Sequence, residues 1–207
     1  MKLSIGVFGS GRGSNFKSVL DKIKEGYLES EIKVVISNNS NAGILEIARL
    51  NNIPSYHISI KQFNSENEFN QKILDVLEKH SVDFILLAGY MKKIDSNIVN
   101  KYKNRILNIH PALIPSFCGQ GMYGLNVHKA VLDYGCKITG VTVHLVNEEY
   151  DNGPIVLQKP VEVNDDDTPE ELADRVLKEE HKLIVEAIRL FEEERLIVKG
   201  RKVIRRK

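Results

Sequence analysis

An amide and an imidazole stand close together in the short apolar run 106–110. Asn108 and His110 lie two residues apart there, and Pro111 follows directly. A β-strand points residues i and i+2 to one face, so both side chains would lie side by side where the proline ends the strand. The carboxyl ends of parallel strands form the ligand-binding edge of an open α/β sheet. The pair is therefore interpreted as a hydrogen-bond donor beside a titratable group, although a strand-end histidine and a turn-forming asparagine explain it without chemistry.

A glycine-rich turn, residues 9–15, follows the first apolar run. Its glycines fall at positions 9, 11 and 13, and Ser14 occupies the place where a dinucleotide fingerprint needs its third glycine. Asn38-Asn39 at the end of the second strand supplies no acid for a ribose diol, and no Gly-Lys-Ser/Thr of a Walker loop follows the turn. Backbone N–H groups at a helix amino terminus suit a single phosphate. The alternative is a tight turn that needs glycine only for its geometry.

An acidic loop, residues 147–154, separates two β-rich runs in the second half of the chain. A carboxylate of this loop beside the imidazole of His110 would favour the protonated imidazolium, which predicts a folded pKa of His110 above the unfolded value. A solvated turn also explains any single acid there. His144, midway along a β-rich run, is interpreted as structural, and Glu180-His181 as part of a helix surface.

Alternating strands and helices are predicted to position these residues. The expected strands are 3–8, 33–37, 56–58, 83–88 and 106–110, and the expected helices are 16–23, 44–50, 69–77 and 98–102. The near-continuous apolar run 83–88 is typical of a strand covered on both faces. This order predicts βαβ units and an open, mostly parallel, twisted α/β sheet of Rossmann-like type with helices on both faces.

The pattern changes after Lys137. Residues 138–146 and 155–163 are β-rich and predict an antiparallel carboxy-terminal extension of the sheet. Thr168-Pro169-Glu170-Glu171 has the amino cap, the first-position proline and the first-turn acids of a helix start. The tail 196–207 alternates around Gly200 like a weak hairpin, and its basic residues are interpreted as a solvated edge.

The composition is that of an ordinary globular chain. With 207 residues, 42% hydrophobic and 28% charged, and a formal charge of +1, a single domain is expected, without a bias toward nucleic acid or a membrane. No apolar run approaches the ~18 residues of a spanning helix, and the amino terminus lacks a secretory pattern, so a cytoplasmic protein is expected. Cys118 and Cys136 lack metal-ligand spacing and are expected to be reduced, neither one being a nucleophile.

Four short segments occur in an order that is far more specific than any one of them. They are Gly-Arg-Gly-Ser-Asn at 11–15, Ala-Gly-Tyr-Met at 88–91, Asn-Ile-His-Pro-Ala-Leu-Ile-Pro at 108–115 and Asp-Asn-Gly-Pro at 151–154. Together they resemble the phosphoribosylglycinamide formyltransferases, the folate-dependent transformylases of purine synthesis. The resemblance covers nearly the whole chain. It implies one formyltransferase domain over 1–207, with a phosphate-binding half, 1–105, and a catalytic and folate half, 106–207.

The resemblance also implies roles for individual residues. The catalytic trio would be Asn108, His110 and Asp151. The substrate-binding residues would be Gly11, Arg12, Gly13, Ser14 and Asn15 at the phosphate and Glu180 at the ribose. The folate-binding residues would be Met91, Lys92, Lys93, Ile94, Asn108, Asn147, Glu148, Glu149, Tyr150 and Asp151.

The implied reaction is attack by the amine of glycinamide ribonucleotide on the formyl carbon of 10-formyltetrahydrofolate, through a tetrahedral oxyanion. Asn108 would donate to the oxyanion, protonated His110 would donate and pass a proton to the leaving nitrogen, and Asp151 would keep the imidazole charged. Such chemistry requires no metal. The expected partners are the two small-molecule substrates, with no nucleic acid or membrane, and the chain is expected to be a monomer or a homodimer.

Two departures from the family pattern and three rival functions stay open. The segment 118–125 is longer than usual, and Glu66 stands near the place where the family often has a folate-contacting arginine. A formyltetrahydrofolate hydrolase and a methionyl-tRNA formyltransferase share a similar Asn and His-Pro core, but each usually carries a further domain for which the chain is expected to have no room. A nucleotide-binding module without catalysis would explain the glycine turn but not the trio.

Overall fold

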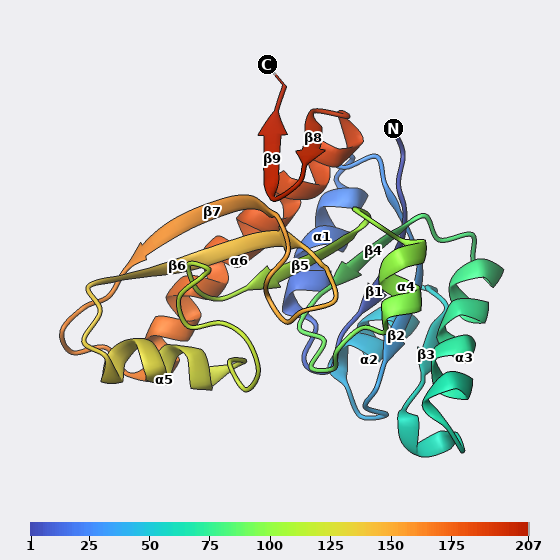
Figure 1. Ribbon diagram of the computed structural model, residues 1–207, viewed down its shortest axis with the longest axis horizontal. Coiled ribbons are helices and arrows are strands. Elements are labelled where there is room, and N and C mark those ends of the chain that lie inside the picture. The colour runs from blue at the N-terminus through green and yellow to red at the C-terminus, as the bar shows by residue number, and fades with distance from the viewer. Residues whose placement is uncertain (207) are drawn as a thin grey trace. The chain divides into compact units, whose positions relative to one another are not determined.

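The computed structural model describes residues 1–206, so the last residue of the predicted basic tail, Lys207, lies outside the described part of the chain. The chain divides into two compact units, Met1–Leu107 and Asn108–Lys207 (Figure 1). Strand β5 (Ile106–His110) begins in the first unit and ends in the second. None of the helices within residues 1–206 is both long enough and apolar enough to span a membrane.

The first unit is built on parallel strands in the order β3-β2-β1-β4-β5. Its strands are β1 (Ser4–Phe8), β2 (Glu31–Ser37), β3 (Ser55–His57) and β4 (Phe84–Leu87), followed by the start of β5. β2 and β4 flank β1 and both pair with it in parallel. Every residue of β4 is buried, as the apolar run 83–88 predicts for a strand covered on both faces.

The helices of the first unit cover both faces of this sheet. They are α1 (Ser14–Lys24), α2 (Gly43–Leu50), α3 (Glu66–Lys79) and α4 (Ser96–Lys101), with a short 3₁₀ turn at Ile60–Gln62. From β1 to β3 the chain steps in one direction along the sheet, and from β3 to β5 in the other. Because such crossovers are right-handed, α1 and α2 must lie on one face and α3 and α4 on the other. The contacts agree, since α1 packs on α2 and Lys101 of α4 pairs with Glu78 of α3.

The second unit contains the predicted antiparallel extension. β6 (Ile138–Leu145) and β7 (Ile155–Glu162) pair antiparallel, and the strand order from the end of β5 is β5-β6-β7-β9-β8. β8 (Leu196–Lys199) and β9 (Lys202–Arg205) form the predicted hairpin, and β9 pairs in parallel with β7 at Ile155 and Lys202. α6 (Pro169–Glu192) packs against β6, β7 and α5 (Leu125–Asp133), as Figure 1 shows.

The two helices of this unit start in different ways. Thr168 caps α6, since its hydroxyl oxygen accepts the N–H of Glu171 at 3.2 Å while its own N–H donates to the Glu171 carboxylate at 2.9 Å. The predicted start of α6 is thus confirmed. α5 begins after Gly124, whose φ is 55°, and no side-chain cap bond is found there among the described residues. A helix of nine residues without a cap residue leaves little sequence signal, which is why α5 was not predicted.

Candidate active site

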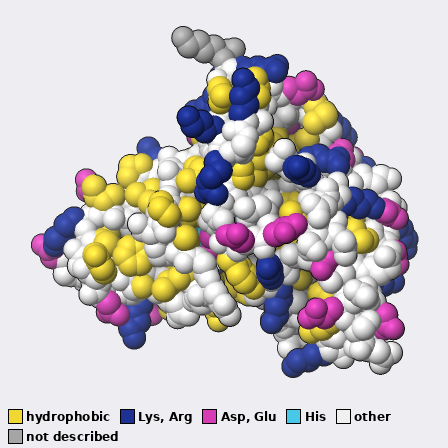
Figure 2. Space-filling view, in the orientation of Figure 1, with side chains coloured by type: hydrophobic (Ala, Val, Ile, Leu, Met, Phe, Trp, Pro, Cys, Tyr) yellow, Lys and Arg dark blue, Asp and Glu magenta, His cyan; other side chains and the backbone are white. Residues whose placement is uncertain are grey.

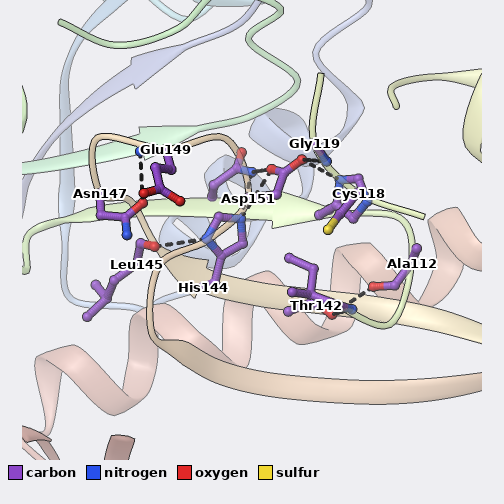
Figure 3. Close-up of polar contacts among 12 residues, drawn as sticks. Ala112, Cys118, Gly119, Thr142, His144, Leu145, Asn147, Glu149 and Asp151 are labelled. Atoms are coloured by element: carbon purple, nitrogen blue, oxygen red, sulfur yellow. Dashed lines mark hydrogen bonds and ion pairs between the residues drawn. The ribbon is translucent and has the colours of Figure 1, made fainter. Parts of the chain in front are cut away.

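The three residues of the predicted catalytic trio lie together in the second unit. Asn108 and His110 come from the end of β5. Asp151 comes from the loop between β6 and β7 (Figure 3). The Asp151 carboxylate lies with Oδ1 3.4 Å from Asn108 Nδ2 and Oδ2 3.6 Å from His110 Nδ1. His110 is 4% exposed, so this arrangement is largely shielded from water.

Asp151 is held by the backbone of the segment that follows β5. The N–H of Gly119 donates to Asp151 Oδ2 at 2.9 Å. Asp151 itself has a φ of 49°, in the left-handed region that aspartate tolerates better than most residues. Burial acts to raise the pKa of Asp151, but its polar neighbours His144 and His110 and the N–H of Gly119 outweigh it and hold this pKa below its usual range. The carboxylate is therefore ionised at neutral pH.

His110 is fixed by hydrogen bonding and is neutral at rest. Its Nε2 lies 2.8 Å from the carbonyl oxygen of Phe117, so Nε2 carries the proton and donates it, leaving the lone pair on Nδ1. Burial lowers the pKa of His110 below its usual value, although the Asp151 carboxylate acts in the opposite direction. The prediction of a raised His110 pKa is therefore wrong. The loss of hydration destabilises the imidazolium more than the carboxylate, 3.6 Å away, stabilises it.

His144 joins the trio as a fourth member. It lies on β6, is 2% exposed, and places Nε2 3.0 Å from Asn108 Nδ2. Its Nδ1 lies 2.8 Å from the Leu145 carbonyl oxygen, so Nδ1–H donates there and Nε2 accepts the amide N–H of Asn108. Nε2 is also 3.5 Å from Asp151 Oδ1. The structural interpretation of His144 is incomplete, because the side chain also orients Asn108, a residue of the predicted trio. The signal in the sequence is a polar residue inside an apolar run.

The segment 117–119 contributes main-chain atoms. Phe117 (φ 49°) supplies the carbonyl that holds His110, and Gly119 (φ 94°) supplies the N–H that holds Asp151. Between them, the Sγ of Cys118 lies 3.3 Å from the Pro115 carbonyl oxygen, and burial and the nearby Asp151 charge raise its pKa. Cys118 therefore stays a thiol at neutral pH, a poor nucleophile. Side-chain patterns give no signal for such main-chain contacts.

The loop 147–154 is braced from within. The N–H of Glu149 donates to Asn147 Oδ1 at 3.1 Å, and Asn152 donates through its amide to the Glu149 carboxylate. A Cβ at Gly153 would lie 1.7 Å from the Leu145 carbonyl oxygen, so only glycine fits there. The residues assigned to folate in this loop, other than Asp151, form an exposed or half-buried rim: Asn147, Glu148, Glu149 and Tyr150.

The glycine turn of the first unit has the geometry expected of a phosphate loop. Gly13 has a φ of 82° and directly precedes α1, which begins at Ser14. A Cβ at Gly13 would lie 2.9 Å from the Cα of Ile44, whereas one at Gly11 would meet open space. The backbone of the turn therefore approaches α2 closely and leads directly into the amino terminus of α1, the end of a helix at which anions bind. Arg12 is exposed and Asn15 is buried.

The residues 91–94 lie beside this turn. The N–H of Met91 donates to Ser10 Oγ at 2.9 Å, and Ser10 donates in turn to Asn38 at 2.5 Å. Met91, Lys92 and Lys93 are exposed and Ile94 is buried. The end of β4 and the glycine turn thus form one surface of the first unit.

Glu180 lies on α6 in the second unit and is only 7% exposed. Its interpretation as a surface charge is therefore wrong. Val176 and Ile184, four residues before and after it, are fully buried. Because residues four apart share one face of a helix, this spacing could have revealed its burial. In residues 1–206, no group of three or more His, Cys, Asp or Glu is arranged to hold a metal ion.

Comparison with known proteins points to one family. The pattern of the family described as "Formyl transferase" matches residues 3–188. The chain is 47% identical to the chloroplastic phosphoribosylglycinamide formyltransferase of Arabidopsis thaliana over 93% of this chain and 66% of the plant protein. It is 37% identical to the Bacillus subtilis phosphoribosylglycinamide formyltransferase over 85% of this chain and 88% of that protein. The chain thus spans a little under two thirds of the length of the plant relative.

The fold is also shared with a solved structure of this kind. Glycinamide ribonucleotide transformylase 1 from Symbiobacterium toebii superposes with a TM-score of 0.93 at 39% identity, over 100% of this chain and 95% of that one. The predicted mostly parallel α/β fold with an antiparallel carboxy-terminal extension is therefore confirmed.

Proposed function

The chain belongs to the formyl transferase family, as its sequence predicted, and from this premise we propose that it transfers the formyl group of 10-formyltetrahydrofolate to the amine of glycinamide ribonucleotide in purine synthesis. The observation that carries the proposal is the placing of the Asp151 carboxylate 3.4 Å from the Asn108 amide and 3.6 Å from the His110 imidazole. An amide donor, a base and a carboxylate are the groups that acyl transfer to an amine needs.

His110 acts first as a base and then as an acid. Because burial keeps its imidazole neutral at rest, it has no proton to give at the outset. Nδ1 carries the free lone pair and takes a proton from the attacking amine as the tetrahedral intermediate forms. The same proton is then given to the folate nitrogen as the C–N bond to it breaks. This order replaces the protonated resting histidine that the sequence suggested.

Asp151 stabilises the charge that His110 acquires during the reaction. Its carboxylate is ionised and lies 3.6 Å from Nδ1, too far for a hydrogen bond to the neutral ring. Once Nδ1 is protonated, attraction between the two charges in this buried site favours the imidazolium. Asp151 thus lowers the free energy of the intermediate and does not charge the resting enzyme.

Asn108 supplies the donor for the oxyanion. Its Nδ2 is engaged by His144 at 3.0 Å and, more weakly, by Asp151 at 3.4 Å. The weaker contact is the one that a developing oxyanion displaces, while His144 keeps the amide oriented. A donor of this kind contributes roughly 3 to 4 kcal/mol to acyl transfer.

The remaining predicted residues complete the proposal. The glycine turn binds the phosphate, Glu180 binds the ribose, and the folate lies against residues 91–94 and 147–151. The half 1–105 thus supplies the phosphate site and residues 91–94 for the folate, and the half 106–207 supplies catalysis, the ribose contact and the other folate residues. The partners are the two small molecules, and the chain works as a monomer or a homodimer. The cytoplasmic location stays a prediction, since the plant relative is named chloroplastic.

One assay tests the proposal against its rivals. Formyl transfer is followed with 10-formyltetrahydrofolate in the presence and absence of glycinamide ribonucleotide. The transferase forms formylated ribonucleotide only when the amine is present. Formate release at the same rate without the amine would favour a hydrolase, and phosphate binding without either reaction would favour a noncatalytic nucleotide-binding module.

A further inference from the structure

The β8–β9 hairpin contacts the loop that carries Asp151, although it lies outside residues 3–188, the part matched by the family pattern. Arg201, in the turn of the hairpin, donates through Nη1 to the main-chain oxygen of Asn152 at 2.9 Å and to its Oδ1 at 3.1 Å. Lys202 pairs with Ile155 at the start of β7. The hairpin therefore touches the loop within one residue of Asp151.

Asn152 is the residue through which this contact reaches the site. Its carbonyl belongs to the peptide bond that follows the one joining Asp151 to Asn152. Its side-chain amide donates to the Glu149 carboxylate. Pro154, two residues on, is fixed by the N–H of Leu145, which donates to its carbonyl oxygen at 2.8 Å. Arg201 thus secures Asn152, between the fixed end of the loop and the catalytic carboxylate.

Asp151 needs such support because of its backbone. A φ of 49° is unfavourable for a residue with a Cβ and persists only where the surroundings impose it. Rotation of the backbone at Asn152 would let Asp151 relax toward negative φ and would carry its carboxylate away from His110. We propose that Arg201 is a positioning residue that holds Asn152, and through it the Asp151 carboxylate, in the geometry that stabilises the protonated His110. This inference rests on the proposed formyl transfer.

The hairpin carries other basic residues, which supply a matched control. Figure 2 shows dark-blue side chains gathered over it, and the exposed ones are Lys199, Arg201, Lys202, Arg205 and Arg206. Arg206 pairs with Arg195 through its main chain. Arg206→Ala removes the same charge from the same hairpin as Arg201→Ala and leaves the bonds to Asn152 in place.

The test compares steady-state kinetics of the two variants. Arg201→Ala should lower kcat roughly tenfold, the scale of one charge-assisted hydrogen bond lost at a partly exposed site, while the KM for the ribonucleotide stays unchanged. Arg201→Lys keeps a donor and should recover part of the loss. Arg206→Ala should behave as wild type. Circular dichroism and thermal unfolding check that each variant is folded.

A double-mutant cycle with Asn152→Ala then isolates the pair. If Arg201 acts through Asn152, the double variant should lose less than the product of the two single losses. Unchanged kcat in folded Arg201→Ala, an equal loss in Arg206→Ala, or strictly multiplicative losses would each overturn the inference. Failure of wild type to transfer formyl at all would instead overturn the proposed function, so the two failures are distinguishable.

Discussion

The proposed chemistry depends on an imidazole held between two unlike acceptors. His110 donates its one N–H to the Phe117 carbonyl oxygen, and the lone pair on Nδ1 faces the Asp151 carboxylate at 3.6 Å. While the ring is neutral, Nδ1 lies too far from the Asp151 carboxylate for a hydrogen bond. Once Nδ1 is protonated, the carboxylate stabilises the imidazolium. Burial, which lowers the resting pKa, thus suits His110 to accept a proton and then release it.

Loss of either reacting side chain should abolish most of the transfer. Asn108→Ala removes the oxyanion donor and His110→Ala removes the base, and each should lower kcat by at least ~10²-fold. The fold should persist, because both side chains are assigned to the reaction and not to the apolar core. Circular dichroism, which reports the backbone, checks this. Near-native turnover in His110→Ala would contradict the assigned role.

Replacement of Asp151 should act through His110. Asp151→Asn keeps the shape of the side chain and tolerates the φ of 49°, but it removes the charge that raises the pKa of His110. The already lowered pKa should fall further, moving the acid limb of the kcat profile to lower pH while kcat itself falls. Titration of His110 by NMR in both proteins measures the change. An unmoved midpoint would leave Asp151 as a turn residue only.

At the scale of elements, the proposed phosphate site depends on the φ value of one glycine. Gly13→Ala should raise the KM for the ribonucleotide, since a Cβ is strained at φ 82° and would lie 2.9 Å from the Cα of Ile44. Folate binding should change little. Gly26→Ala is the matched control, with a φ of 73° and open space around its Cβ. Equal weakening of both ligands would indicate general damage to the first βα unit.

Helix α5 carries a buried titratable residue with consequences for acid stability. His128 is 4% exposed, and burial, aided by the neighbouring His110 when that ring is protonated, lowers its pKa from 6.5 to about 4. As pH falls, the unfolded chain therefore protonates this histidine before the folded chain does. The stability present above pH 6.5 is lost as pH falls from 6.5 toward 4. At pH 5 the loss amounts to about 2 kcal/mol.

His128→Gln removes this titration. The free energy of unfolding of the variant minus that of wild type should be about 1 to 2 kcal/mol larger at pH 5 than at pH 8. Urea unfolding at both pH values measures it. Lys129→Gln, a neighbouring exposed position, serves as the control. The same difference between variant and wild type at both pH values would show that His128 does not titrate in this range.

Elements followed from the sequence wherever one physical pattern dominated. The run 83–88 is apolar throughout because β4 is buried on both faces, and Thr168 with Glu171 forms the capping box that starts α6. The contacts within the candidate site are harder to predict from the sequence than the elements are. His144 reaches Asn108 only through strand pairing, and the carbonyl of Phe117 is a main-chain atom that side-chain patterns do not describe.

At the scale of the whole molecule, binding and folding are linked. A ligand that binds only the native state stabilises it by RT ln(1 + [L]/Kd), about 2.7 kcal/mol at a hundred times Kd. For a chain of 207 residues, each kcal/mol raises Tm by roughly 2 to 4 °C. At a hundred times its Kd, glycinamide ribonucleotide alone should therefore raise Tm by about 5 to 10 °C. Calorimetry measures this increase.

The variants divide this stabilisation by site and separate binding from catalysis. Gly13→Ala should lose most of the Tm increase, because the phosphate supplies the charge that the start of α1 binds. Asp151→Asn should keep it, because its carboxylate serves the reaction and not the ribonucleotide phosphate. Loss of the increase in Asp151→Asn together with its retention in Gly13→Ala would place the phosphate away from the glycine turn. A protein that binds the ribonucleotide fully but transfers the formyl group more slowly is therefore the expected state of Asp151→Asn.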